Sequence, residues 1–94
     1  VGHDLREKLD ALCAELSLQY HGVRFRTTGY RLFVEIHLLF PHHVSVGEAH
    51  RLATLLEERL PERLGAPAEV ITHLESLEDH SRFHREEHYT GKPS

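Results

Sequence analysis

Two stretches of the chain carry apolar residues at spacings of three and four, which places them on one face of an α-helix. The first covers residues 4–17 and the second residues 46–63. Ser45 precedes the second stretch and Glu48 follows three residues later, which predicts a capping box at its start. The predicted apolar stripes consist of Leu5, Leu9, Leu12, Cys13 and Leu16 in the first helix, and of Ala49, Leu52, Ala53, Leu56 and Leu60 in the second.

Three other segments alternate apolar and polar residues, which is typical of β-strands. The segment "HGVRFRTTG" turns at Thr28-Gly29 into the run 30–40, and this arrangement predicts a hairpin. Pro41 ends the second strand, and the break Gly65-Ala66-Pro67 precedes the third strand, "AEVITHLE", at residues 68–75.

The order of these elements, helix-strand-strand-helix-strand, predicts an α+β fold with a small mixed sheet. A helix that connects the second and third strands makes a crossover, so these strands pair in parallel while the hairpin is antiparallel. Both helices are then expected on one face of the sheet. The other face keeps apolar residues without a covering layer, from which we expect an isologous homodimer. That face carries Phe33, Leu39 and Ile71 together with His37, His73 and Glu75.

Composition narrows the functional classes. The chain has 94 residues, enough for one modest domain, with 39% hydrophobic and 28% charged residues. A net charge of -4 argues against a nucleic-acid partner, so Arg24, Arg26 and Arg31 are interpreted as a solvated or salt-bridged strand face rather than as an RNA-binding surface. One Cys, no secretory signal and no long apolar run indicate a reduced, cytoplasmic setting, and Cys13 is expected to be an inert core thiol. The chain begins at Val1 rather than Met, which is compatible with a piece cut from a larger protein.

The ten histidines are the unusual feature of the composition. Paired strands can bring His21, His37, His73 and Glu75 to one end of the sheet, and His50 can join from the same or the partner subunit. Imidazoles with a carboxylate form a ligand set that zinc and similar divalent ions prefer, whereas calcium and magnesium prefer oxygen. If two ions bind side by side, Glu75 can bridge them, and Glu35 can orient an imidazole. Spacing alone leaves structural and ligand roles for these histidines equally open.

Residues 77–94 are charged and polar, so they are interpreted as a helical or disordered tail that follows a domain of residues 1–76. In the tail, His80, His84 and His88 are four residues apart and would share one face of a helix, where a pair can chelate a metal. A solvated tail in which histidines repeat by chance is an equally good interpretation.

Four segments of the chain resemble the cytoplasmic C-terminal domain of cation diffusion facilitator transporters. They are "HGVRFRTTG", "FVEIHL", "SVGEAHRLATLLEERL" and "VITHLE", in the family's order. The resemblance implies a ferredoxin-like, metallochaperone-like fold that dimerises through its sheet face. It also implies metal ligands, at or near the dimer interface, at His21, His37, His50, His73 and Glu75.

The leading hypothesis is therefore a regulatory, zinc-type metal-binding dimerisation domain of a cation efflux transporter, joined to a membrane half if the chain is a fragment. A free-standing cytosolic metal buffer or chaperone and a purely structural dimerisation module are the alternatives. An enzyme is the least supported class, because the pattern contains no acid-base arrangement with a substrate cleft. Protons compete for imidazole nitrogen, so metal affinity is expected to fall from about pH 7 toward 5.5.

Overall fold

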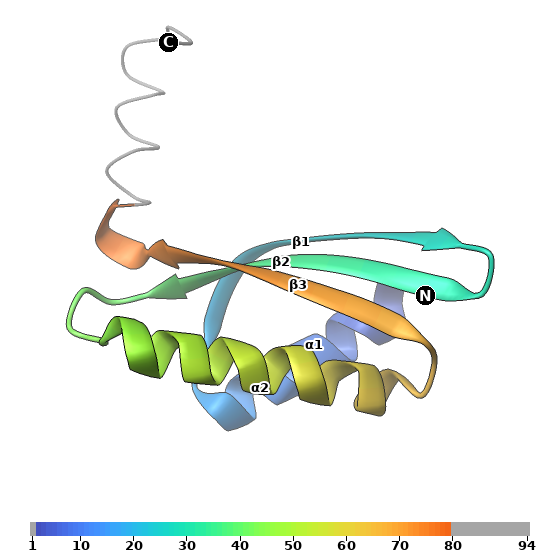
Figure 1. The fold of residues 1–94 in the computed structure, drawn as a ribbon, viewed down its shortest axis with the longest axis horizontal. Helices are drawn as coiled ribbons and strands as arrows, with labels where there is room; N and C mark the ends of the chain where they lie inside the picture. The colour runs from blue at the N-terminus through green and yellow to red at the C-terminus, as the bar shows by residue number, and fades with distance from the viewer. Residues whose placement is uncertain (1, 80–94) are drawn as a thin grey trace, which may run out of the picture.

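A computed structural model describes residues 2–79 of the chain, and Figure 1 shows its five elements. They are α1 (Gly2–Leu16), β1 (Gln19–Thr28), β2 (Arg31–Phe40), α2 (Val46–Leu64) and β3 (Ala68–Ser76). The order predicted from the sequence is confirmed. Only the ends differ, chiefly because α1 starts two residues earlier and β1 starts before His21.

The three strands form one mixed sheet with β2 in the centre. β1 pairs antiparallel with β2, and β3 pairs parallel with β2, in a register that places His37 beside His73. The ladder between β1 and β2 is irregular between Tyr20 and Gly22, so His21 is an extra residue in a β-bulge. Bulges redirect side chains, and this one lies directly opposite the central histidine.

Both helices pack on the same face of the sheet, as predicted (Figure 1). Leu9 of α1, Leu56 of α2 and Ile36 of β2 belong to one core cluster. Each of the three side chains is 0% exposed. Cys13 lies in this core, as expected, and burial raises the pKa of its thiol to about 11. Apolar burial therefore fixes which face of β2 points at the helices, and its alternate residues must point the other way.

The ends of α2 follow from local chemistry. Ser45 Oγ accepts a hydrogen bond from the Glu48 backbone N–H at 3.0 Å, so the predicted N-cap is present. The reciprocal half of the capping box is replaced: the guanidinium of Arg51 donates two hydrogen bonds to the Glu48 carboxylate, at 3.0 and 2.7 Å. Gly65 ends the helix in the left-handed conformation, with φ +66°, which glycine adopts without strain.

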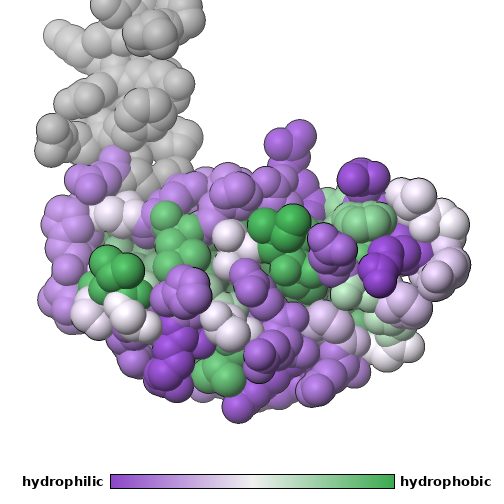
Figure 2. All heavy atoms as spheres, viewed as in Figure 1, coloured by the Kyte–Doolittle hydropathy of each residue, from purple (hydrophilic) through white to green (hydrophobic). Residues whose placement is uncertain are grey.

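The face of the sheet away from the helices is called the open face below. Ile71 is 50% exposed on it, whereas Leu39 is only 6% exposed beneath its neighbours. Figure 2, drawn from the same side as Figure 1, shows the open face only edge-on; on the side that carries α2 and β3 it shows hydrophobic patches separated by hydrophilic side chains. In the described part of the chain, neither helix has the length and apolar character needed to cross a membrane.

Candidate metal centre

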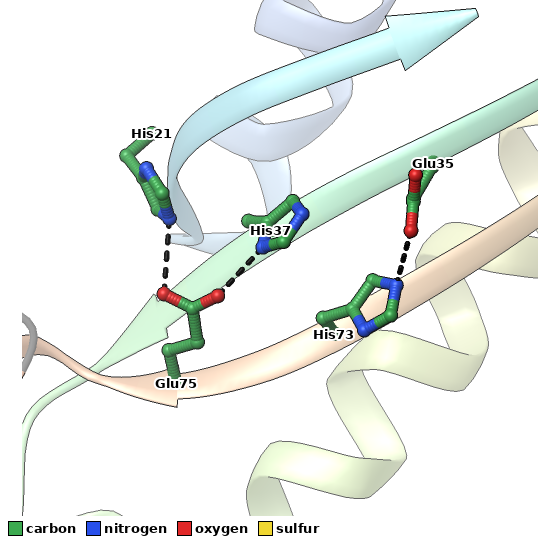
Figure 3. Close-up of polar contacts among 5 residues, drawn as sticks. All are labelled: His21, Glu35, His37, His73 and Glu75. Atoms are coloured by element: carbon green, nitrogen blue, oxygen red, sulfur yellow. Dashed lines mark hydrogen bonds and ion pairs between the residues drawn. The ribbon is translucent and has the colours of Figure 1, made fainter. Parts of the chain in front are cut away.

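Three strands each contribute an imidazole to the open face. His21 comes from the bulge in β1, His37 from the middle of β2 and His73 from β3. Alternation along each strand adds Glu35 two residues before His37 and Glu75 two residues after His73. Figure 3 shows the five side chains gathered across the three strands. Residues up to 54 positions apart in the sequence therefore come within hydrogen-bonding distance.

The Glu75 carboxylate joins two of the imidazoles. Its Oε1 lies 3.0 Å from His21 Nε2, and its Oε2 lies 2.6 Å from His37 Nδ1. The hydrogen bond from His37 contributes most to lowering the pKa of Glu75, and the bond from His21 adds to it, while partial burial opposes both. Glu75 is therefore held as an anion between two nitrogen ligands, the form in which a carboxylate binds a metal.

A second carboxylate contacts the third imidazole. Glu35 Oε2 lies 2.6 Å from His73 Nε2. The rings of His37 and His73 are stacked, with centroids 4.7 Å apart and planes inclined by 15°. The ring of His21 meets His37 edge-on, with centroids 5.3 Å apart. The ring of His37 therefore contacts the rings of both His21 and His73.

These contacts produce two overlapping sets of donor atoms. Group 1 is His21, His37 and Glu75, and group 2 is Glu35, His37 and His73. Within each group, one potential ligand atom per residue lies within 4.8 Å of the others. Each group offers two imidazole nitrogens and one carboxylate oxygen, which fits zinc and related borderline divalent ions better than calcium or magnesium. The five side chains are 29–46% exposed, so ions can reach them from solvent.

The structure places the predicted ligands unequally. Four of them, His21, His37, His73 and Glu75, lie together. His50 lies exposed near the start of α2, on the helix side of the sheet, and belongs to neither group within one protomer. Its predicted role as a ligand would require the partner subunit, and that role stays a prediction. The predicted tail ligands His80, His84 and His88 lie outside the described residues.

Glu35 is a ligand candidate that the sequence pattern indicates only as a residue that orients an imidazole. Its contact with His73 is the geometry that such a role requires, yet it is also a full member of group 2. The available signal was its position two residues from His37 on the same strand face. The choice between ligand and orienting residue depends on distances that spacing does not supply.

A depression of about 430 Å³ borders the cluster, and its lining includes Phe33, Glu35 and Ile71. Arg26 lies over the ring of Phe33 within it, 4.7 Å from the ring centroid, and Glu69 on its rim lies 3.9 Å from Arg31. The basic strand face proposed from the sequence is therefore engaged, at least in part, in contacts within the protomer.

Comparisons with known proteins agree with this architecture. Residues 3–77 match the family described as "Cation efflux protein, cytoplasmic domain". A curated relative, the uncharacterized transporter sll1263 of Synechocystis, is 36% identical over 62 residues, which make up 66% of this chain and 20% of that protein. The chain thus spans about a fifth of the length of the curated relative it matches.

Solved structures share the fold. The metal-bound C-terminal domain of the CzcD transporter from Thermotoga maritima has a TM-score of 0.73 at 24% identity, over 81% of this chain and 91% of that one. The Zn form of CzrB has a TM-score of 0.67 at 30% identity, over 78% and 81%. The C-terminal domain of the magnetosome protein MamB from Desulfamplus magnetovallimortis has a TM-score of 0.69 at 19% identity, over 79% and 93%.

Proposed function

We propose that this chain, which belongs to the family of cytoplasmic domains of cation efflux proteins, binds a zinc-type divalent ion on its open sheet face and couples that binding to dimer geometry. Family membership confirms the resemblance drawn from the four sequence segments, and with it the cytoplasmic location and the dimerisation type of the domain. The family consists of transporter domains rather than an enzyme class. The metal, its ligands and their role in regulation are the proposal.

The observation that carries the proposal is the placement of Glu75 between two imidazoles. A carboxylate 3.0 Å from His21 Nε2 and 2.6 Å from His37 Nδ1 brings one oxygen and two nitrogen donors from three strands to one point. The structural relatives add support, because CzcD was solved as a metal-bound domain and CzrB in a Zn form.

Within a protomer, the sheet holds the donors in position before any ion arrives. Rigid strands fix the backbone of all three, and the hydrogen bonds of Glu75 orient both rings. When bound, a divalent ion would act as a Lewis-acidic cross-link among them. Three protein donors leave a tetrahedral ion one open position, which water or a residue of a second copy can fill. His73 on the same face and His50 on α2 are the candidates for that additional contact.

Coupling to the dimer follows from linkage. If the closed dimer offers a fuller set of ligands than the open one, metal binding stabilises closure, and closure raises metal affinity by the same factor. In an intact transporter, such closure would transmit the cytosolic metal level to the membrane part.

The test is zinc titration by calorimetry at pH 7 and 5.5, combined with sedimentation or small-angle scattering of the dimer. We expect one or more bound ions at pH 7, weaker binding at pH 5.5, and a change of dimer shape with zinc. His37→Ala should remove tight binding, whereas His43→Ala, an exposed histidine outside both groups, should not. Equal zinc binding by the protein and His37→Ala would refute the site, and a dimer unaffected by bound zinc would refute the coupling.

A further inference from the structure

The two outer histidines of the cluster lie on the two edge strands of the sheet. β2 has a strand on each side, whereas β1 and β3 each pair with β2 alone. The backbone of His37 is therefore held by two ladders, while those of His21 and His73 are held from one side only. His21 also lies in the bulge, where its ladder is interrupted. The geometry of the cluster consequently depends on what else holds the two edge strands.

In β3, the residue before His73 is tied to α2. The hydroxyl and the backbone N–H of Thr72 both donate to Glu57 Oε2, at 2.6 and 3.2 Å. An edge strand presents N–H groups without a strand partner, and Glu57 gives this one a charged acceptor. Both residues are half-buried, which strengthens the two hydrogen bonds. Because successive side chains of a strand point to opposite faces, fixing Thr72 on the helix side also fixes the direction of His73 on the open face.

In β1, the residue before His21 is tied to α1. The Tyr20 hydroxyl donates to Asp10 Oδ1 at 2.5 Å, the length of a strong hydrogen bond to a carboxylate, and Tyr20 packs against the core beneath the sheet. Tyr20 is also the last residue in register with β2 before the bulge, opposite Leu38. Its attachment to α1 therefore fixes the point from which the bulge directs His21 to the open face.

We propose that Asp10 and Glu57 are positioning residues of the metal centre, which hold from the helix side the residues that precede the two outer histidines. This inference rests on the proposed metal-binding function and is independent of the number of ions that the cluster holds. Neither carboxylate belongs to group 1 or group 2, and both lie on helices that cover the opposite face of the sheet (Figure 1). They act through the backbones of β1 and β3 on the positions of the ligand nitrogens.

The zinc affinity of single variants of the full chain tests this inference, measured by calorimetry at pH 7 with a competing chelator that masks weak binding by other histidines. Tyr20→Phe removes only the hydroxyl that donates to α1. Glu57→Ala removes the acceptor on α2, whereas Glu57→Gln keeps an amide oxygen that can accept both hydrogen bonds. Circular dichroism checks folding, and Thr72→Val, which removes the hydroxyl alone, replaces Glu57→Ala if that variant does not fold.

Two matched controls accompany these variants. Tyr30→Phe removes a hydroxyl from an exposed tyrosine at the hairpin turn, far from the bulge along β1. Glu15→Ala removes a helix carboxylate that pairs with Arg63 between α1 and α2 rather than with a strand. Urea titration of every variant measures the loss of stability separately from the loss of zinc affinity.

Tyr20→Phe and Glu57→Ala should each weaken zinc binding by about 10-fold. This is the lower end of the cost of removing a partner that orients a ligand, because the two carboxylates act one residue away from the imidazoles. Glu57→Gln and both controls should bind zinc nearly as tightly as the parent protein. Bound Co²⁺ in place of zinc has visible absorption bands that depend on donor geometry, and these bands should change in Tyr20→Phe and Glu57→Ala but not in the controls.

Unchanged zinc affinity and unchanged cobalt spectra in Tyr20→Phe and Glu57→Ala would overturn the inference and leave the metal-binding function intact. An equal loss in Glu15→Ala would also overturn it, because general destabilisation would then be the cause. So would a loss in Glu57→Gln as large as that in Glu57→Ala, since removal of the negative charge alone would explain both. A parent protein that binds no zinc would instead refute the proposed function itself, so the two failures are distinguishable.

Discussion

Replacing Glu75 with Gln tests how much the carboxylate contributes to metal-linked stability. In the structure, each Glu75 oxygen accepts from a different imidazole, at 3.0 and 2.6 Å. A Gln amide is neutral, keeps one acceptor oxygen and presents an NH2 group to the other ring. It therefore loses both the anionic donor and one of the two orienting hydrogen bonds.

The expected magnitude follows from linkage between binding and folding. Zinc at 100 times its dissociation constant stabilises the folded protein by about 2.7 kcal/mol, which raises the melting temperature of a domain this size by roughly 10–20 °C. If Glu75→Gln weakens binding about 100-fold, the same zinc concentration contributes only about 0.4 kcal/mol, or roughly 2–3 °C.

The assay is differential scanning fluorimetry with and without zinc, at fixed protein concentration because a dimer's melting temperature depends on it. Glu69→Gln is the matched control, since Glu69 lies on the same strand face and has a long ion pair, 3.9 Å, with Arg31. Its zinc-dependent shift should equal that of the parent protein. A full shift in Glu75→Gln would refute the reasoning, because the carboxylate would then contribute nothing to binding.

Three further predictions concern the scaffold. Leu56→Ala, at a core position that is 0% exposed, should lower the free energy of unfolding by about 2–5 kcal/mol in urea titrations, and a smaller loss would indicate that the core collapses around the cavity. Ser45→Ala should cost about 1 kcal/mol through loss of the N-cap, whereas Ser45→Asp should retain most of the stability. Because burial raises the pKa of Cys13 from 9.0 to about 11, the unfolded chain loses this proton first, so stability should fall as pH rises between these values. Cys13→Ala should decline less steeply over that range in denaturant titrations, and an identical slope would count against the burial of the thiol.

Local patterns were sufficient for the elements of the fold. The topology was predicted from three local features: the apolar periods of α1 and α2, the Thr28-Gly29 turn, and the crossover between β2 and β3. The structure has the predicted topology. The capping box was only half right, because Arg51 on the next helical turn competes for the Glu48 carboxylate. Periodicity reports the face on which a side chain lies, but not which of several polar partners it contacts.

The sequence predicted which residues belong to the candidate site, but not which of them contact one another. Alternation placed His37, His73 and Glu75 on one face, strand pairing indicated that His21 and His50 could join them, and the family resemblance implied that all five are ligands. Their grouping depended on the bulge at His21 and on the parallel register of β2 with β3, which sets His37 beside His73. Both features result from the packing of the whole sheet. The same packing leaves His50 on the opposite side and makes Glu35 a possible ligand.

The amino-acid sequence by itself determined the order of the elements, the residues that form the core and the side of β2 and β3 on which their histidines lie, because these properties depend on periods of two and 3.6 along one segment. Only the tertiary structure decided which nitrogen meets which carboxylate, and that two sets of donors share one imidazole. Such contacts join segments up to 54 residues apart, and their distances depend on sheet register to within about an ångström, a precision that local pattern does not encode.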